Sequence, residues 1–278
     1  MDCQFVEAQI VTWLKNQVSI TKQKGFVVGV SGGIDSALVS TLCAKTGLPT
    51  IVVSLPIDLH STVLADSHMT WLTTNYTNVK SSECFLTNAF YSFEAAVWGD
   101  IFDHNTYSVD TGENRDLVSA NIRSRLRMCA LYAFANASGF LVVGTGNKVE
   151  DYGVGFFTKY GDGSVDISPI GDLFKSEVRE LAAHLGVTED IVKAAPTDGL
   201  WADGRTDEDQ IGATYDELEW AMQLLSRIEM SETTLEKVRQ EKQEDLTERQ
   251  WEVLAIYLKR HNANRHKMKM PPVCIVER

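Results

Sequence analysis

Short apolar runs alternate with longer stretches of helical periodicity over the first two thirds of the chain. Segments 25–30 (GFVVGV) and 50–55 (TIVVSL) are rich in β-branched residues, which is typical of strands buried on both faces of a parallel sheet. Apolar residues at helical spacing precede them, so an amphipathic helix is expected to open the chain. Its apolar face is predicted to carry Val6, Ile10, Trp13 and Leu14.

The alternation continues to about residue 169. Further strands are predicted at 76–81 and 140–143, and helices at 35–44, 60–74, 83–98 and 114–138. Because strands that alternate with helices indicate βαβ units, the sequence predicts an α/β fold: a doubly wound, Rossmann-like, mostly parallel sheet with helices on both faces. We expect a single domain over 1–278, with an α/β core at about 20–185 and a helical C-terminal part at about 186–278.

The charge of the chain argues against a general role in nucleic-acid binding. The 278 residues include 38 acidic and 26 basic ones, for a net charge of −12, whereas neutralising phosphates takes a surplus of Lys and Arg. The charge is distributed unevenly along the chain. Residues 259–278 have a net positive charge, whereas the residues before them have a net negative charge. Such a tail could bind an anionic ligand, could bind the acidic body of a second copy, or could be a solvated end.

The remaining composition predicts a cytoplasmic protein. The sequence has no run of about 18 apolar residues, so no membrane span is expected, and its N-terminus lacks the pattern of a signal peptide. Its five cysteines are widely spaced and form no C-x-x-C pair. We therefore expect reduced, mostly structural thiols.

The most informative segment is 29–36 (GVSGGIDS), which follows the first predicted strand and opens a helix. Ligands bind at this end of the strands in open α/β sheets, and bare N–H groups at a helix N-terminus attract phosphate. The loop is neither a Walker A motif nor G-x-G-x-x-G, and its Asp35 is free to bind Mg²⁺. The expected ATP-binding residues here are Gly29, Val30, Ser31, Gly32, Gly33, Ile34, Asp35 and Ser36.

The string SGGIDS resembles the phosphate loop of the ATP pyrophosphatases, which split ATP between its α- and β-phosphates. The resemblance implies that an oxygen of the substrate is adenylated and that a nitrogen or sulfur nucleophile then displaces AMP. The motif identifies a superfamily and leaves the substrate open.

Five further segments narrow the resemblance. They are 143–150 (VGTGNKVE), 157–163 (FTKYGDG), 166–175 (DISPIGDLFK), 195–197 (APT) and 265–267 (RHK). In this order and spacing they resemble ammonia-dependent NAD synthetase over about residues 25–272. The resemblance implies a homodimer that binds deamido-NAD across its interface. It also implies that the nicotinate carboxylate attacks the α-phosphorus of ATP and that ammonia then displaces AMP.

The resemblance also implies roles at the ATP end of the site. Asp35 and Glu150 match carboxylates that bind Mg²⁺, and hard oxygen ligands suit this ion beside phosphates. Lys175 matches a lysine that contacts the ATP phosphates, and Thr145 and Thr197 match other ATP contacts. We therefore expect Asp35 and Lys175 to be catalytic.

The residues matched to deamido-NAD lie in several segments. Arg125 matches the arginine that holds the dinucleotide, and Lys159 and Asp166 match further contacts. Asp166 is expected to be catalytic as well, near the nicotinate end where ammonia arrives. His266 and Lys267 match a pair that closes over the dinucleotide, often from the partner subunit.

The arginines around position 125 also have a simpler explanation, as solvated side chains of a helix. Arg123, Arg125 and Arg127 are spaced two residues apart, so at most two of them share a helix face, and each taken alone reads as a solvated side chain.

The sequence departs from the family pattern in three places. Ala120 stands where glycine is common, the gap from Glu150 to Thr158 is about one residue longer than in some members, and 198–200 (DGL) replaces a more usual Ala-Asp-Leu. These differences concern local loop geometry and leave the phosphate loop intact.

Other functions share parts of this pattern. Relatives that resemble GMP synthetase or asparagine synthetase use the same loop but normally carry a glutamine-hydrolysing domain, and a tRNA-thiolating relative would need catalytic cysteines and a basic surface. A nucleotide sensor without catalysis could keep the loop and lose the carboxylates. The chain matches none of these expectations, which favours ammonia as the nitrogen donor, either free or delivered by a separate protein.

Overall fold

The structure is a computed structural model that describes residues 1–58, 62–103, 113–197, 206–226, 235–236, 238 and 246–276. The side chains of 100–103 and 113–114 are outside this description, as is the departure from the family pattern at 198–200.

The centre of the fold is a parallel sheet in the order β3-β2-β1-β4. Its strands are β1 (Phe26–Gly29), β2 (Thr50–Ser54), β3 (Val79–Glu83) and β4 (Leu141–Val143). Val28 of β1 lies opposite Val52 on one side and Val143 on the other, and Ile167 extends the sheet by a parallel bridge to Val143. The chain winds outward from β1 to β3 and then returns to the other side, so the predicted doubly wound sheet is confirmed.

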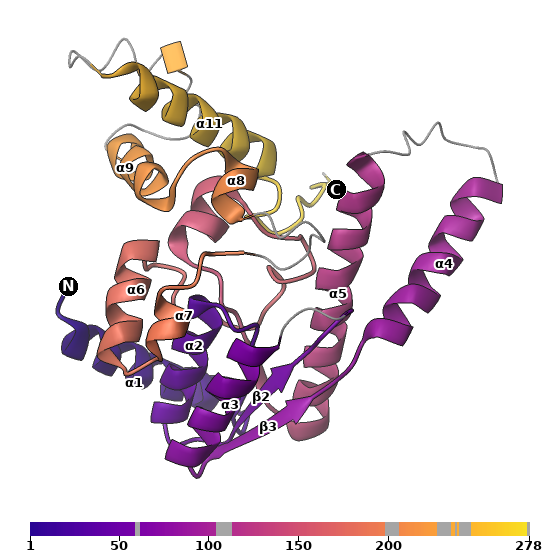
Figure 1. The fold of residues 1–278 in the computed structure, drawn as a ribbon, viewed down its shortest axis with the longest axis vertical. Helices are drawn as coiled ribbons and strands as arrows, with labels where there is room; N and C mark the ends of the chain where they lie inside the picture. Colours follow the sequence, from indigo (N-terminus) through magenta and orange to yellow (C-terminus); the bar gives the residue numbers. More distant parts are fainter. Residues whose placement is uncertain are drawn as a thin grey trace.

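Eleven helices can be followed through the described residues (Figure 1). They are α1 (Cys3–Thr21), α2 (Ile34–Lys45), α3 (Val63–Asn75), α4 (Thr87–Asp103), α5 (Glu113–Ser138), η1 (Lys148–Val154), α6 (Lys175–His184), α7 (Glu189–Val192), α8 (Asp207–Ile211), α9 (Tyr215–Leu225) and α11 (Glu248–Asn264). The third strand lies at 79–83, a few residues after the predicted 76–81, so α4 begins at Thr87. Within the described part of the chain, no helix is long and apolar enough to cross a membrane.

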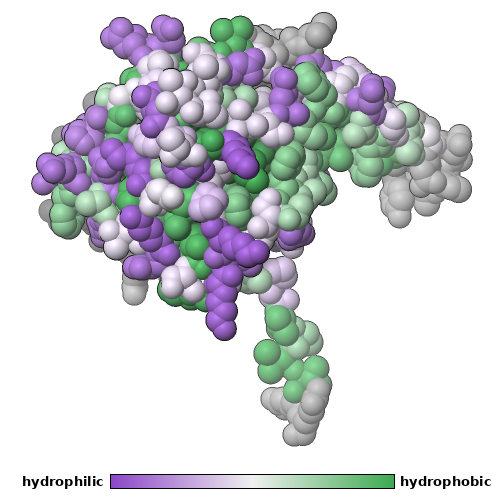
Figure 2. Space-filling view, turned by 90° about the horizontal axis from the view of Figure 1, so that it is seen from below, coloured by the Kyte–Doolittle hydropathy of each residue, from purple (hydrophilic) through white to green (hydrophobic). Residues whose placement is uncertain are grey.

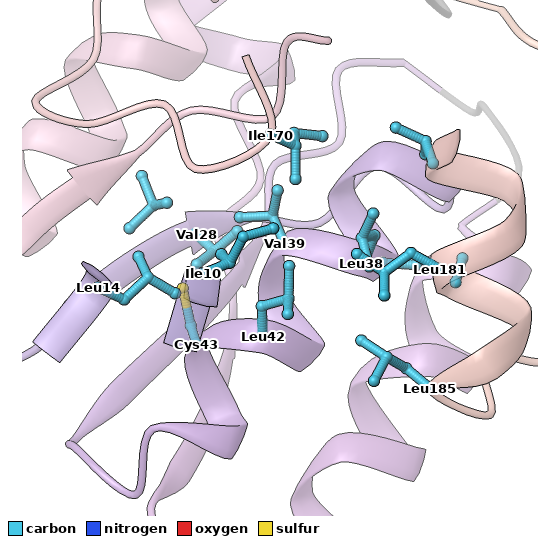
Figure 3. Close-up of a cluster of buried hydrophobic side chains, with 14 of the residues drawn as sticks. Ile10, Leu14, Val28, Leu38, Val39, Leu42, Cys43, Ile170, Leu181 and Leu185 are labelled. Carbon is cyan, nitrogen blue, oxygen red and sulfur yellow. The ribbon is translucent and has the colours of Figure 1, made fainter. Parts of the chain in front are cut away.

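The two faces of the sheet are covered by different helices. Val28 and Val143 pack with α1, α2 and α6 in a core that Figure 3 shows in close-up. Val27 and Val142 point to the opposite face, where α5 covers them. Burial on both faces explains why the strands are apolar runs and do not alternate with polar residues.

One detail of the opening helix differs from the prediction. Ile10 and Leu14 are buried as expected, and Val18 continues their face one turn later. Trp13 is 38 % exposed, so its place on the apolar face was wrong. Residue 13 lies only one position from residue 14, and a step of one turns the helix by about 100°.

A second core lies in the C-terminal half and joins η1, α9 and α11. Tyr215 of α9 and Tyr257 of α11 are fully buried in it, together with Val149 and Val154 of η1. Figure 1 shows α8, α9 and α11 as a helical layer at one end of the sheet domain. Because η1 follows β4 almost directly, this layer lies against the segment that leaves the carboxyl end of the sheet.

Candidate active site

The phosphate loop leaves β1 and enters α2, as predicted. Ser31 and Ser36 tie the loop together, because the Ser31 N–H donates to the Ser36 Oγ at 3.2 Å and the two hydroxyl oxygens lie 3.1 Å apart. Ser36 in turn donates to the Gly33 carbonyl at 2.9 Å. These bonds fix the turn in the conformation that begins α2.

Gly32 shows why the loop needs glycine. Its φ is +88°, in the left-handed region that side chains disfavour. A Cβ on Gly32 would also lie 3.0 Å from the Ala65 nitrogen and 3.1 Å from the Leu64 Cβ, at the start of α3. The loop therefore approaches α3 closely through a backbone without a side chain.

A buried ion cluster lies beside this loop. The Lys175 Nζ is 2.5 Å from the Asp35 Oδ2 and 3.0 Å from the Glu150 Oε1, and Lys175 is only 2 % exposed. Asp35 lies in the first turn of α2, Glu150 in η1 and Lys175 at the start of α6. Three residues that are far apart in the sequence, each predicted to act on ATP or its metal, thus meet within hydrogen-bonding distance.

The two carboxyl groups of the cluster respond differently to their surroundings. Burial raises the pKa of Asp35, and the charge of Glu150 adds to this, while Lys175 opposes both. Burial also acts to raise the pKa of Glu150, but the charge of Lys175 and the Tyr215 hydroxyl outweigh it and hold that pKa below its usual value. Glu150 is therefore the more firmly ionised of the two.

The electrostatic balance favours the charged lysine. Burial acts to lower the pKa of Lys175, but the charges of Asp35 and Glu150 outweigh it and raise that pKa above its usual value. The cluster thus holds a cation between two carboxyl groups.

Asn147 connects the phosphate loop to η1. Its Nδ2 donates to the Asp35 Oδ1 at 3.2 Å, and its Oδ1 accepts from the N–H groups of Val149 and Glu150. The residue is fully buried and caps the N-terminus of η1. One side chain therefore fixes the separation between the two carboxylate-bearing helices.

The helix that carries Glu150 is a π-helix. π-turns are rare and are frequently found at functional sites. This one places Glu150 in the ion cluster with Lys175 and Asp35.

The helical layer contributes Tyr215 to the cluster. Its hydroxyl donates to the Glu150 Oε1 at 2.5 Å and lies 3.2 Å from the Asp207 Oδ2, and its ring lies under the Lys175 Nζ, 4.7 Å from the ring centre. Burial, followed by the charges of Glu150 and Asp207, raises the pKa of Tyr215 far above its usual value. The hydroxyl therefore keeps its proton and acts as a donor.

The same helix holds the start of α6. Glu219, one turn after Tyr215, accepts from the Ser176 N–H at 2.8 Å and from the Ser176 hydroxyl at 2.7 Å. Ser176 follows Lys175 directly, so α9 fixes both the lysine-bearing helix end and the Glu150 carboxylate.

Asp35 and Glu150 have the chemistry of a site for a hard divalent cation. Both are carboxylates, and both already converge on one cationic group, the Lys175 ammonium. Within the described residues, no group of three or more His, Cys, Asp or Glu side chains is placed to hold a metal. The donor set fits an ion that takes one or two protein carboxylates and completes its coordination with phosphate and water, as Mg²⁺ does.

A second polar group is formed where the loop 157–163 packs on α5. The Ser124 hydroxyl donates to the Asp162 Oδ1 at 2.6 Å, and the Thr158 hydroxyl donates to the Asn121 Oδ1 at 2.6 Å. A Cβ on Gly161 would lie 2.2 Å from the Ser124 Oγ, so the loop can approach the helix this closely only with glycine there. The segment TKYGDG is thus a fixed loop on the arginine-bearing helix.

The residues predicted to bind the dinucleotide meet at this loop. The Arg125 Nε donates to the Lys159 carbonyl at 3.2 Å, and the Lys159 Nζ donates to the His266 carbonyl at 2.8 Å. The Lys267 Nζ donates to the Phe157 carbonyl at 2.7 Å. Arg125, Lys159, His266 and Lys267 are therefore brought together, and the basic tail lies against the loop of its own chain.

Arg123, Arg125 and Arg127 of α5 point in two directions, as their spacing predicted. Arg123 contacts the Asp58 Oδ2 at 3.4 Å and lies over the ring of Phe90, and the Arg127 Nε donates to the Leu55 carbonyl. Both thereby hold the chain just after β2, whereas Arg125 turns toward the loop.

Asp166 lies apart from the ion cluster in its bonding. Its Oδ2 accepts from the Val142 N–H at 2.8 Å, and its Oδ1 accepts from the Tyr132 hydroxyl at 3.1 Å. These contacts tie Asp166 to β4 and α5, so a catalytic role for it remains a prediction. Thr145 and Thr197 lie after β4 and after α7, and their contacts with ATP remain predictions as well.

Asp151 is affected by charges from both polar groups. Burial raises its pKa well above the usual value, and the charges of Glu150, Asp162 and Asp35 add to this while Lys267 opposes them. Asp151 is therefore within electrostatic range of the ion cluster and of the second group, the loop–tail group formed by the loop 157–163 with His266 and Lys267.

Sequence reasoning missed three residues of this site. Asn147 had a detectable signal, since asparagine after a Gly-Thr-Gly turn is a typical helix cap. Tyr215 and Glu219 lie four residues apart, which places them on one helix face, but nothing local indicates that this face meets Glu150 and Ser176.

The chain is similar to known proteins along most of its length. The family model for NAD synthase matches residues 6–271. The NH(3)-dependent NAD(+) synthetase of Methanococcus aeolicus is 37 % identical over 219 residues, covering 79 % of this chain and 82 % of that protein. The one from Archaeoglobus fulgidus is 34 % identical over 276 residues, covering 99 % and 98 %.

The fold has a similar counterpart among solved structures. That of an NMN synthetase from Francisella tularensis superposes with a TM-score of 0.77 at 30 % identity, covering 99 % of each chain. With a family model that matches nearly the whole chain and relatives that align along almost all of its length, the chain belongs to the NAD synthase family.

Proposed function

We propose that this protein is a ligase that amidates deamido-NAD with ammonia and ATP, giving NAD, AMP and pyrophosphate. The observation that carries the proposal is the convergence of Asp35, Glu150 and Lys175 beside the phosphate loop. Membership of the NAD synthase family and the likeness to NH(3)-dependent NAD(+) synthetases support the substrate.

The reaction proceeds in two steps, adenylation of the carboxylate and displacement of AMP by ammonia. An oxygen of the nicotinate carboxylate attacks the α-phosphorus of ATP, the bond between this phosphorus and the bridging oxygen breaks, and pyrophosphate leaves. Ammonia then attacks the activated carbonyl carbon, the bond to AMP breaks, and the nitrogen loses a proton. The N–H groups and hydroxyls of the phosphate loop hold the pyrophosphate.

The chain's own charges serve the first step. Lys175 supplies a buried cation next to the phosphates, where a low dielectric strengthens its interaction with the developing charge. Asp35 and Glu150 would hold Mg²⁺, which neutralises phosphate charge when bound. Thr145 and Thr197 complete the proposed ATP contacts.

The second polar group binds the other substrate. Arg125 and Lys159 on one side and Lys267 on the other present cationic side chains around the loop 157–163, and His266 lies next to Lys267. These charges suit the phosphates and carboxylate of deamido-NAD. Asp166 would then lie near the nicotinate end and assist the attack by ammonia.

We also propose that the protein works as a homodimer in the cytoplasm. Large apolar side chains are exposed near α4 and α5, including Phe85, Tyr91, Phe93 and Leu117. Figure 2 shows a mostly apolar arm that stands off the body, and the C-terminal residues 270–276 carry exposed Met, Val and Ile side chains. A second copy would cover such surfaces. The five free cysteines suit a reducing compartment.

One assay tests the function. Purified protein with ATP, Mg²⁺, deamido-NAD and ammonium should produce NAD, AMP and pyrophosphate in equal amounts, as measured by chromatography. Production of ADP and phosphate would overturn the cleavage between the α- and β-phosphates. Replacing ammonium with glutamine should abolish turnover, and sedimentation of the same sample gives the oligomeric state.

The same assay should be run with a second candidate substrate, the acid form of NMN, because the similar structure from Francisella tularensis is that of an NMN synthetase. The acid form of NMN carries the same nicotinate carboxylate and lacks the adenylate half of deamido-NAD. A higher kcat/KM with the acid form of NMN than with deamido-NAD would replace the proposed substrate and keep the chemistry of the site.

A further inference from the structure

The helical layer reaches the proposed metal carboxylate through one side chain. Tyr215 is fully buried, and its hydroxyl lies 2.5 Å from the Glu150 Oε1. No other part of α9 supplies a hydrogen bond to Glu150 among the described residues. The contact spans 65 residues of sequence, so it forms only when the helical layer is packed on η1.

The Glu150 carboxylate is bonded by residues of other elements as well as by the cap of its own helix. The Asn147 Oδ1 accepts from the Glu150 N–H, and the Asn147 side chain also helps to lower the pKa of the Glu150 carboxyl group. Lys175 and Tyr215 both bond the same oxygen, Oε1. This leaves Oε2 as the oxygen that the hydroxyl and the ammonium do not engage.

The surroundings of Tyr215 are themselves fixed. Its N–H donates to the Glu208 Oε1 at 3.0 Å, and Thr214 caps α9 with its hydroxyl. Glu219 on the same helix ties α9 to the start of α6 through Ser176. The hydroxyl is therefore presented by a helix anchored at two points, as expected of a group that orients a metal ligand.

We propose that Tyr215 is a positioning residue for the metal site: its hydroxyl fixes the carboxylate of Glu150 so that one oxygen faces the phosphate loop and Asp35. This rests on the proposed function, in which Glu150 holds Mg²⁺. In this proposal Tyr215 acts through its bond to Glu150 and not by contact with ATP or the dinucleotide. It thereby makes metal binding depend on the packing of the helical layer against η1.

The chain offers a matched control in Tyr257. This tyrosine is also fully buried in the same core, and its hydroxyl has no hydrogen-bond partner among the described residues. Tyr215→Phe and Tyr257→Phe each remove one buried hydroxyl and keep the ring. Only the first removes a contact with Glu150.

The main readout is metal affinity, measured without turnover. Mn²⁺ binding is followed by electron paramagnetic resonance in the presence of an ATP analogue with a methylene bridge between the α- and β-phosphorus atoms. Tyr215→Phe should raise the Mn²⁺ dissociation constant about tenfold, the usual cost of losing a group that orients a ligand. Tyr257→Phe should leave it unchanged.

Steady-state kinetics should show a change in the Mg²⁺ dependence without a change in the KM for deamido-NAD, which a purely structural role would not give. Tyr215→Phe should raise the Mg²⁺ concentration for half-maximal rate by a similar factor, with the KM for deamido-NAD unchanged. In a Glu150→Gln background, adding Tyr215→Phe should have no further effect on Mn²⁺ affinity. An unchanged Mn²⁺ affinity in Tyr215→Phe, or an equal loss in Tyr257→Phe, overturns the proposal.

A further measurement does not need Tyr215→Phe to fold. Wild-type protein labelled with ¹³C at the tyrosine Cζ gives signals from its eight tyrosines. Bound Mn²⁺ should broaden the signal of a tyrosine next to the metal, and Mg²⁺ should not. If all eight signals survive saturating Mn²⁺ and analogue, Tyr215 does not adjoin the metal. A protein that binds Mn²⁺ as expected but makes no NAD would refute the proposed function and leave the role of Tyr215 intact.

Discussion

The two polar groups of the site are held in different ways. In the ion cluster, buried charged side chains bond directly to one another, with Lys175 between Asp35 and Glu150. In the loop–tail group, lysine and arginine side chains bond to backbone carbonyls, as Lys159 does to His266 and Lys267 does to Phe157. The first group pairs one cation with two carboxyl groups, and the second has no carboxylate among these contacts.

This difference suggests a division of labour. A buried cluster of bonded charges is costly to disturb, because removing one member leaves another charge unpaired. Cations bonded to carbonyls, and not to carboxylates, can pair with an incoming anion. The ion cluster therefore suits phosphate chemistry, and the loop–tail group suits the recognition of one substrate.

The largest expected effect comes from Asp35→Asn. The change removes a proposed metal carboxylate without changing core volume, so kcat should fall on the order of a hundredfold or more while the far-ultraviolet circular dichroism stays unchanged. Asp172→Asn is the control, because Asp172 is an almost fully exposed carboxylate that pairs with Lys148. A near-normal rate for Asp35→Asn would remove this carboxylate from the mechanism.

Lys175→Met tests whether the cluster is held by its charge balance. Met keeps most of the volume but leaves two carboxyl groups facing each other, so the free energy of unfolding should fall by about 3–5 kcal/mol in urea denaturation. Lys148→Met is the matched control, since the ion pair of Lys148 is with the exposed Asp172, and its ammonium also lies over the Phe174 ring. Equal stability losses in the two variants would contradict the picture of a cluster held together by its buried lysine.

The loop–tail group should respond mainly in substrate binding. Ending the chain after Asn264 removes His266 and Lys267, and with them the bonds to Lys159 and Phe157. We expect the KM for deamido-NAD to rise about tenfold, as for the loss of a hydrogen bond to a charged group, with the KM for ATP unchanged. Lys267→Met alone should reproduce part of the loss. Unchanged kinetics would mean that the tail has no part in binding.

The same division explains what the sequence could predict. The strands, the phosphate loop and the roles matched to the family lie in contiguous segments such as 29–36 and 157–163, where local periodicity and spacing carry the information. The bond from Asn147 to Asp35 and the bond from Tyr215 to Glu150 join residues that are 112 and 65 positions apart. Such contacts are set by tertiary packing, and no local pattern in one sequence encodes them.

The smallest expected effect comes from Tyr132→Phe, which tests whether Asp166 has a structural or a catalytic role. Burial, followed by the charge of Asp166, raises the pKa of Tyr132 to about 12. The folded state therefore favours the protonated hydroxyl, and the stability this bond contributes is present below pH 10 and is lost as the pH rises from about 10 to 12. Tyr132→Phe should lower the free energy of unfolding by about 1 kcal/mol at pH 7, and the deficit should shrink above pH 10.

The KM for ammonium shows whether the bond from Tyr132 to Asp166 matters for the mechanism. Tyr132→Phe keeps the Asp166 carboxylate and its bond to the Val142 N–H, so the KM for ammonium should stay normal. Asp166→Asn keeps an acceptor for the same N–H but removes the charge, and if Asp166 assists the attack by ammonia, the KM for ammonium should rise severalfold. A normal KM for ammonium in Asp166→Asn, with a stability loss like that of Tyr132→Phe, would make Asp166 a residue that holds β4 to α5 and would confine the chemistry to the ion cluster.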